Sequence, residues 1–550
     1  MLFFSLQNQA QGKMFFSPCL RVFGALMACG CLWVGPSKGQ SPIGLFITNS
    51  PTYAVPVDFI GLSFGTETAG EVFSSSATQL ITLFQQIGIR NLRFMGDEET
   101  SHIKNEFAFA KTEGSLEIIY GVTLTNVPDA VAAASYIWAN EAAQLDCFEI
   151  GNEPDWTSAN NGKTEGPGIT NYSSFLAAWS NNATAMLAVA PGATFEGIDT
   201  GDDYDTGPPD KSNGAWENNG TEWTTNFAYA EKNSGIVKLI TQHDYMADML
   251  PGGITITNGT NLIAAILSPG WDTVTNQILY NAVGAPVLAD GLPYRFTEAN
   301  EITGGIEGAS DAFGAALWAL DFMHWWAAHG ISGINFHNQG WIPTDTIFPD
   351  GAGNYEVHPK AYAIKAFDVG GQGSVDPLGM VNVQGVNLTA YAVGDETNLY
   401  VTLINREYGS GARNASVTLN LAGFSTGSIM AMYLTDASGI YATNGVTLGG
   451  SIITNNAAWT GAWMALGSVT NNQCTVSVPA TSAAIVKIAA GPERMNAQNL
   501  GAGQLQLTWS YGTLQSATNV AGPYSDVPNA ASPYTIPAGN PQQFYRAREN

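Results

Sequence analysis

Short apolar runs alternate with helix-like segments from about residue 43 to residue 365. Runs such as Phe59–Phe64, Ile89–Phe94 and Leu116–Val122 have the length and the apolar content of buried strands. Between them, Ala77–Ile87 and Ala130–Ala143 carry apolar residues at helical spacing. This alternation is typical of repeated β/α units, which fold around a parallel sheet.

The remaining apolar runs complete a set of eight. The fourth strand precedes Pro154, and the others are expected at Ala193–Ile198, Leu239–Tyr245, Tyr294–Glu298 and Ile331–His337, with an apolar helix at Asp311–His329. Eight repeats over roughly 320 residues predict an α/β fold, namely a (β/α)8 TIM barrel with enlarged loops. The loop Gly201–Glu222 is rich in Asp, Gly, Asn and Trp, so we expect it to face a substrate.

After about residue 366 the helical spacing disappears. Runs such as Leu399–Ile404 and Ala415–Asn420 alternate with Gly and Asn turns, which predicts a β-sandwich appended to the barrel. Gly491-Pro492-Glu493 is typical of a linker, and a small C-terminal β module of unassigned role is expected after it. The predicted domains are a signal peptide (1–40), a catalytic barrel (41–365), a β-sandwich (366–490) and the C-terminal module (491–550).

The N-terminus has the pattern of an export signal. Lys13 and Arg21 precede the apolar run Val22–Gly35, which is too short to be a transmembrane anchor. We therefore expect cleavage near residue 40 and a secreted, periplasmic or cell-surface protein. The stretch before Cys29 is a weak lipoprotein-type match, so a lipoprotein is the less favoured alternative. The sequence does not predict the oligomeric state.

Composition and charge narrow the classes of partner. The 550 residues include 46 acidic and 20 basic side chains, and a net charge of −26 repels polyanions, so we expect no nucleic-acid partner. Cys147 and Cys474 are far apart and are expected to be free, buried thiols. Asp202, Asp203 and Asp205 lack the spacing of a complete Ca²⁺ loop, so no metal site is predicted.

One carboxylate stands at an unusual position. The stretch Phe148–Trp156 begins apolar, breaks at Gly151 and then places Asn152, Glu153 and Pro154 in succession. Proline disfavours helical geometry at the preceding residue and lacks a backbone donor, so the fourth strand is expected to end here. Because barrel enzymes carry their chemistry at the carboxyl ends of strands, Glu153 is a candidate catalytic group.

The seventh strand ends in a second carboxylate, Glu298. The fourth and seventh strands lie across the mouth of an eight-stranded barrel, so both side chains face one cleft. Two carboxylates about 5–5.5 Å apart are what a retaining glycosidase requires. We expect Glu153 to be the acid/base and Glu298 the nucleophile, with no cofactor. Glu301 and Glu307 are less well placed rivals for the nucleophile.

Further substrate-binding residues are expected near these strand ends: Asn152, His243, Tyr245, Arg93, Asp97 and His337. Tyr245 or His243 is expected to donate to Glu298 and keep it ionised, and Asn152 to bind a sugar hydroxyl. The alternatives are that His243 and Tyr245 belong to the barrel core and that Arg93 forms a structural ion pair. The Trp318, Trp325 and Trp326 side chains are expected in the core.

These motifs resemble those of a known family. Glu149–Pro154 is similar to the acid/base motif of clan A glycoside hydrolases, and Phe296–Asn300 with Gly308–Asp321 resembles the nucleophile region of glycoside hydrolase family 79. Val57–Phe64 is similar to the first barrel strand of that family. The resemblance covers roughly residues 50–490. It implies a barrel with a packed β-sandwich and a β-glucuronidase or heparanase type of activity.

Two segments depart from the family pattern. Family members commonly carry a Glu directly after the first-strand Phe, whereas Gly65 follows Phe64 here and Glu67 comes later. The segment Arg93–Glu98 is looser than the usual Gly-rich version. The resemblance implies that both segments contact the terminal sugar. The departures therefore leave the identity of that sugar undetermined, while the expected mechanism is unaffected.

The sequence therefore predicts a secreted retaining glycoside hydrolase, β-glucuronidase-like, that cleaves β-linked uronic acid sugars from a carbohydrate. The acidic chain favours exo action on a neutral glycan capped by one uronic acid over a sulfated polymer. The alternatives are a clan A hydrolase with xylan or glucan specificity and a noncatalytic glycan-binding protein.

Overall fold

The computed structural model describes residues 42–65, 69, 72–96, 100–155, 168–201, 220–249, 256–395, 397–421, 424, 426–467, 469–490, 496–501, 503–509, 513–537 and 543–548. The expected signal peptide, the linker at 491–493, Asp97, the three Asp residues of the rejected Ca²⁺ loop and nearly all of the loop 201–222 lie outside these residues. None of the helices in the described ranges has the length and hydropathy needed to cross a membrane.

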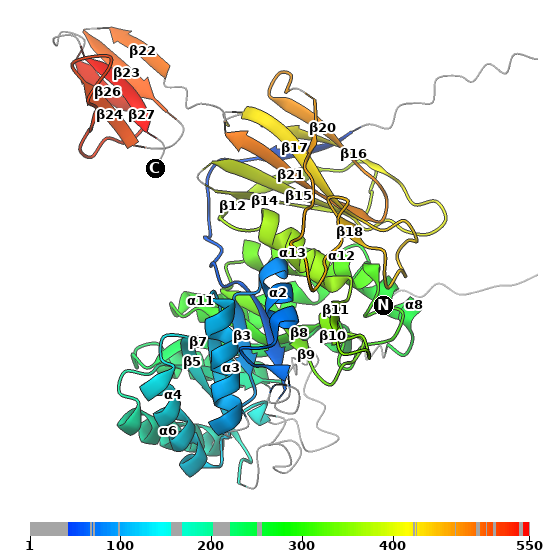
Figure 1. The fold of residues 1–550 in the computed structure, drawn as a ribbon. Helices are drawn as coiled ribbons and strands as arrows, with labels where there is room; N and C mark the ends of the chain where they lie inside the picture. The colour runs from blue at the N-terminus through cyan, green and yellow to red at the C-terminus, as the bar shows by residue number, and fades with distance from the viewer. Residues whose placement is uncertain are drawn as a thin grey trace, which may run out of the picture. The chain divides into compact units, whose positions relative to one another are not determined.

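Eight parallel strands form a closed barrel (Figure 1). They are β2 (Ile60–Phe64), β3 (Asn91–Phe94), β4 (Glu117–Val122), β5 (Leu145–Ile150), β6 (Phe195–Thr200), β7 (Val237–Tyr245), β8 (Tyr294–Asn300) and β9 (Gly333–Asn338). Each expected strand is present within a few residues of its predicted position, and β9 closes the barrel by pairing with β2. The predicted TIM-barrel fold class is confirmed.

Helical segments connect the barrel strands. The longer ones are α2 (Thr78–Ile87), α3 (Thr100–Glu113), α4 (Val127–Asn140), α6 (Tyr172–Val189), α7 (Gly220–Glu231), α8 (Gly259–Ile266), α12 (Phe313–Ala328) and α13 (Lys360–Gly370). Between β7 and β8 lie η1 (Met246–Met249), α9 (Trp271–Val274), α10 (Asn276–Leu279), η2 (Tyr280–Gly284) and α11 (Ala285–Ala289). The hairpin β10 (Ile347–Pro349) and β11 (Tyr355–Val357) follows β9.

The sandwich consists of two sheets. One has the order β13-β1-β16-β20 and the other β12-β14-β15-β21-β17-β18, with β19 also paired to β17. The strands are β1 (Ile43–Ile47), β12 (Ser374–Asp376), β13 (Leu378–Val381), β14 (Leu388–Gly394), β15 (Asn398–Asn405), β16 (Ala415–Asn420), β17 (Thr426–Thr435), β18 (Thr447–Leu448), β19 (Met464–Ala465), β20 (Gln473–Val478) and β21 (Ser482–Ala490). Apolar residues from both sheets form a core of their own.

The predicted boundary between barrel and sandwich needs a correction at its N-terminal end. Residues 41–365 were assigned to the barrel, but β1 pairs with β13 and β16 in the sandwich (Figure 1). Ile43, Leu45 and Ile47 are buried while Gly44 and Phe46 are not, which is the alternation of a strand with one solvated face. Helix α13 also extends beyond residue 365.

The C-terminal module contains two three-stranded sheets with a small core of their own. Its strands are β22 (Asn496–Gly501), β23 (Gln504–Thr508), β24 (Thr513–Ala517), β25 (Ser525–Asp526), β26 (Tyr534–Pro537) and β27 (Phe544–Arg548). The expected β character of this segment is therefore present.

Helix α12 is buried on all sides. Trp318 and Trp326 are fully buried and Trp325 nearly so, which confirms that these side chains are core rather than a sugar platform. Cys147 and Cys474 are buried free thiols, as predicted. Helix α12 is apolar all round, which fits its position, because Trp326 and Trp318 pack on Phe296 and Phe336 of the barrel while another side of the helix contacts β14 of the sandwich.

Asp321 on α12 joins the barrel to the sandwich. Its carboxylate accepts hydrogen bonds from Thr389 Oγ1 and Tyr391 Oη, each at 2.7 Å, and pairs with Arg406 Nη1 at 2.7 Å. The side chains of Asp321 and Arg406 are 1% and 3% exposed, so neither charge is solvated. Removing one member of a buried pair leaves the other uncompensated.

We therefore expect Asp321→Ala to lower the free energy of unfolding by about 3–5 kcal/mol. Chemical denaturation followed by tryptophan fluorescence measures this difference. The control is Lys111→Ala, because the Lys111 side chain is 47% exposed and its pair with Glu141 is worth about 1 kcal/mol or less. Equal losses of unfolding free energy in the two variants would contradict a larger contribution of the buried pair to stability.

Candidate active site

Strand register gathers polar side chains at the carboxyl end of the barrel. Ser63 on β2 lies opposite both Arg93 on β3 and His337 on β9. On β5, Phe148 and Ile150 pack in the main core outside the barrel, whereas Cys147 belongs to a separate small cluster. Because side chains alternate along a strand, Glu149 points to the same interior as Cys147.

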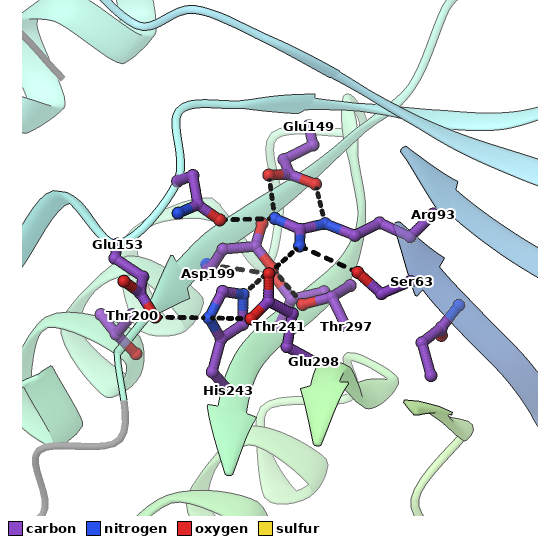
Figure 2. Close-up of polar contacts among 12 residues, drawn as sticks. Ser63, Arg93, Glu149, Glu153, Asp199, Thr200, Thr241, His243, Thr297 and Glu298 are labelled. Carbon is purple, nitrogen blue, oxygen red and sulfur yellow. Dashed lines mark hydrogen bonds and ion pairs between the residues drawn. The ribbon is translucent and has the colours of Figure 1, made fainter. Parts of the chain in front are cut away.

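Arg93 connects most of the site (Figure 2). Its Nε and Nη2 donate to the two oxygens of Glu149 at 2.6 and 2.5 Å, and Nη2 also donates to Asn152 Oδ1 at 2.7 Å. Its Nη1 donates to Ser63 Oγ at 3.2 Å and to Glu298 Oε1 at 2.6 Å. Five contacts match the five N–H donors of a guanidinium, so the fully buried Arg93 side chain is satisfied by the protein itself.

Glu298 is held as a carboxylate. Tyr245 Oη donates to Glu298 Oε2 at 2.8 Å, Arg93 binds the other oxygen, and His337 Nδ1 lies 3.5 Å from that oxygen. Burial alone would raise the pKa of Glu298, but the charges of His243 and Arg93 and the Tyr245 hydrogen bond together lower it well below its usual value. An ionised, buried carboxylate is suited to nucleophilic attack.

Glu153 lies close to Glu298, and His243 contacts both carboxylates. Its backbone has a φ of +47°, in the left-handed region that side chains other than glycine rarely adopt. The Glu153 N–H donates to the Asp199 carbonyl at 2.9 Å, and Asp199 has a φ of +48°. Each such residue costs on the order of 1–3 kcal/mol and persists because the surroundings hold it. One carboxylate oxygen of Glu153 lies within 4.8 Å of one of Glu298.

His243 lies between the carboxylates. Its Nδ1 is 2.9 Å from Glu153 Oε1 and 3.5 Å from Glu298 Oε2, and its Nε2 is 3.6 Å from Asp199 Oδ1. Burial would lower the pKa of His243, but the negative charges of Glu298, Asp199 and Glu153 raise it well above its usual value. Of the two donors to Glu298 that the sequence predicts, Tyr245 forms the hydrogen bond. His243 lies nearer to Glu153 than to Glu298.

The trio Glu153, His243 and Glu298 has the spacing of metal ligands. A metal-bound imidazole must be neutral, whereas the surrounding carboxylates raise the pKa of His243 and so favour its protonated form. The arrangement is suited to moving protons and to stabilising a positively charged transition state.

Most of the other expected positions fall at this mouth. His337 hydrogen-bonds Ser63 Oγ at 3.2 Å, and Asn152 presents its amide oxygen to Arg93, since a guanidinium only donates. The rivals of Glu298 lie elsewhere, because Glu301 forms a fully buried ion pair with Lys360 at 2.8 Å and Glu307 is exposed.

Sequence reasoning missed a buried layer below the carboxylates. Thr241 and Thr297 donate to Glu196 and Asp199, respectively. Burial raises the pKa of Glu196 well above its usual range, while hydrogen bonds from Glu196 and His243 outweigh burial and lower the pKa of Asp199 to about 2. Asp199 directly follows the predicted fifth strand, so the strand-end rule that found Glu153 would also have found it.

Comparison with known proteins relates the chain to one family. Residues 390–485 match the model described as the glycosyl hydrolase family 79 C-terminal beta domain. A β-glucuronidase of Aspergillus niger is 29% identical over 118 residues, which is 20% of this chain and 21% of that protein. The chain thus aligns with about a fifth of the length of this curated relative.

Solved structures share the fold. A 4-O-α-L-rhamnosyl-β-D-glucuronidase of Fusarium oxysporum has a TM-score of 0.61 at 18% identity and covers 80% of this chain and 99% of its own. A family 51 arabinofuranosidase of Xanthomonas axonopodis pv. citri has a TM-score of 0.57 at 14% identity over 81% and 99%. A bifunctional glucanase-xylanase from a metagenome library has a TM-score of 0.56 at 14% identity over 82% and 100%.

Proposed function

We propose that this glycoside hydrolase family 79-like protein is a retaining β-glycosidase, β-glucuronidase-like, in which Glu298 is the nucleophile and Glu153 the acid/base. The proposal rests on one carboxylate oxygen of Glu153 lying within 4.8 Å of one carboxylate oxygen of Glu298. Retaining enzymes hold their carboxyl groups about 5–5.5 Å apart, whereas inverting enzymes leave about 6.5–9.5 Å for a water molecule. The chemistry needs no cofactor.

The surrounding contacts fit a double displacement. Glu298 attacks the anomeric carbon and forms a glycosyl ester while protonated Glu153 donates its proton to the leaving oxygen. Water then attacks the anomeric carbon of this ester, Glu153 removes the proton from that water, and the bond from the anomeric carbon to Glu298 breaks to release the carboxylate. Tyr245, Arg93 and His243 lie around Glu298, so they stabilise the charge that it carries before and after the intermediate.

One observation favours a second candidate, a clan A type of hydrolase for neutral glycans. A uronic acid needs donors for its carboxylate, but the five N–H donors of Arg93 already meet protein acceptors. The similar folds include an arabinofuranosidase and a glucanase-xylanase.

The test is a panel of aryl β-glycosides that includes the glucuronide, glucoside, xyloside and galactoside. Following the reaction by proton NMR identifies the anomer formed first, and a retaining enzyme releases the β anomer. Cleavage of the glucuronide alone supports the first candidate, and cleavage of a neutral glycoside alone supports the second. If no glycoside is cleaved and sugars still bind, the protein is a noncatalytic glycan-binding protein.

The proposed location is extracellular, periplasmic or at the cell surface. This proposal is carried by the basic and apolar pattern of residues 1–40. Mass spectrometry of the mature protein from its culture medium and membrane fractions tests it, because a cleaved signal moves the N-terminus to near residue 40. A lipid-modified Cys29 would support the lipoprotein alternative.

Tyr245→Phe is expected to move the acidic limb of kcat/KM to higher pH by about one pH unit, since a hydrogen bond to a charged group is worth about 1.5–3 kcal/mol. Glu298 must be ionised to attack, and its lowered pKa places its limb below the ordinary value of 4.5. Removing the Tyr245 hydroxyl raises that pKa, so activity is lost earlier as pH falls. Rates measured from pH 8 down to the lowest pH at which the protein stays folded locate the limb, with exposed Tyr441→Phe as the control. An unmoved limb would contradict the role of this hydrogen bond.

A further inference from the structure

A cavity of about 630 Å³ lies apart from the catalytic carboxylates. Its walls come from the β10–β11 hairpin, the start of α13 and two sandwich segments, 443–446 and 452–456, which flank β18. The hairpin follows β9, the barrel strand that ends at His337 and Asn338 (Figure 1). A volume of this size falls in the range of small-molecule sites in proteins, about 300–1,000 Å³.

Hydrogen bonds between the walls hold the cavity open. Asn455 Nδ2 donates to the Tyr355 carbonyl at 2.8 Å, which ties the second sandwich segment to the hairpin. The Ile453 N–H donates to Tyr362 Oη on α13 at 3.0 Å, and Gln86 Nε2 on α2 donates to the Thr454 carbonyl at 2.5 Å. Since these bonds come from three different elements, the cavity is formed before any ligand arrives.

The lining combines flat apolar faces with neutral polar groups. Phe348, Tyr355 and Tyr362 supply aromatic surface, and Asn444 and Asn456 supply amides. Ile452, also in the wall, is 57% exposed and would become buried under a ligand. Aromatic faces that pack on C–H groups, together with amides that both donate and accept, are suited to a polyhydroxylated ring.

Charge further limits the ligand. Lys and Arg are absent from the described residues that line the cavity, whereas Asp311 and Glu356 are present. His358 is fixed in one tautomer, because its Nδ1 donates to the Asp345 carbonyl at 2.6 Å. Burial lowers the pKa of His358, so the ring is neutral. A cavity with carboxylates and no cation disfavours anions such as uronic acids or sulfated sugars.

We propose that this cavity is an accessory site that binds neutral sugar units of a glycan. The choice of a sugar rests on the proposed function, and the preference for neutral units rests on the lining itself. The hairpin connects the two sites, because Tyr355 in the cavity wall packs against Trp341, three residues beyond the end of β9, at 6.0 Å between ring centroids. A glycan held here would be retained on the enzyme between catalytic events.

The experiment is calorimetric titration of the full-length Glu298→Gln variant with xylotriose and with cellotriose, since this variant is expected not to turn them over. Asn444→Trp, added to fill the cavity from an exposed wall position, is expected to weaken binding at least about tenfold. Ile452→Ser, which removes apolar wall surface, is expected to weaken it as well. The matched control is Asn233→Trp, at an exposed turn before β7 and outside the lining, and it should leave binding unchanged.

The proposal is overturned if neither trisaccharide binds, or if both wall variants bind the sugar as tightly as their parent. Spermidine tests whether the carboxylates of Asp311 and Glu356 select a cation instead. Displacement of the sugar by tighter binding of spermidine would also overturn the proposal. Melting temperatures establish that each variant is folded. Hydrolysis of the aryl glycoside panel by the unaltered protein reports the catalytic centre alone. Sugar binding without hydrolysis therefore rejects the proposed function, and hydrolysis without cavity binding rejects the accessory site.

Discussion

Replacing Glu298 with alanine is expected to lower kcat for an aryl β-glycoside on the order of 10⁴-fold or more. The reason is geometric as well as electrostatic. Tyr245, Arg93 and His337 surround this carboxylate within 2.6–3.5 Å, so no other group of the described site is placed to attack in its stead. Substrate binding should survive, because the change removes the attacking group and leaves the rest of the cleft.

Azide makes this prediction specific. In the space left by the Glu298 side chain, azide attacks the anomeric carbon directly and displaces the activated leaving group, so the product is an α-glycosyl azide. Proton NMR of the product distinguishes this anomer. The matched control is Glu307→Ala, an exposed carboxylate nine residues further along the chain, which should retain full activity. A Glu298→Ala enzyme that remains active without azide would contradict the assignment of the nucleophile.

The barrel was predictable because its strands are buried on both faces and punctuated by Gly and Pro. Strand ends then located Glu153 and Glu298 without any contact information. The strand β1 was misassigned because proximity in sequence suggested the barrel, whereas pairing with β13 and β16 is a long-range choice. Only the alternation of buried and exposed residues in β1 pointed the other way.

The contacts within the site were harder to predict. His243 was expected near Glu298. In the structure its Nδ1 faces Glu153 and its Nε2 faces Asp199. This arrangement depends on the positive φ of Glu153 and Asp199, which the sequence does not reveal. The partners in the five contacts of Arg93 come from three strands, β2, β5 and β8, and from the segment after β5, so no single segment encodes them. Sequence thus located the proposed reacting groups at strand ends, while their hydrogen bonds required the closed barrel.

Replacing Glu153 with alanine is expected to have an effect that depends on the leaving group. For an alkyl or unactivated aryl β-glycoside, kcat/KM should fall about 10²–10⁴-fold, because the leaving oxygen no longer receives a proton. For a 2,4-dinitrophenyl glycoside, whose leaving group needs no proton, kcat/KM should remain within about tenfold of the unaltered enzyme. Steady-state rates across a series of leaving groups measure the difference. Equal losses across the series would instead indicate a structural role for Glu153.

The second step of the reaction, hydrolysis of the glycosyl ester, tests the role of Glu153 independently. With Glu153 absent, no base activates water, so the glycosyl ester on Glu298 accumulates and the activated substrate gives a burst of product. Azide needs no base and attacks the ester on the face opposite Glu298, so it restores turnover and yields a β-glycosyl azide. The opposite anomers formed by the two alanine variants would therefore assign both roles, and the same anomer from both would refute the double displacement.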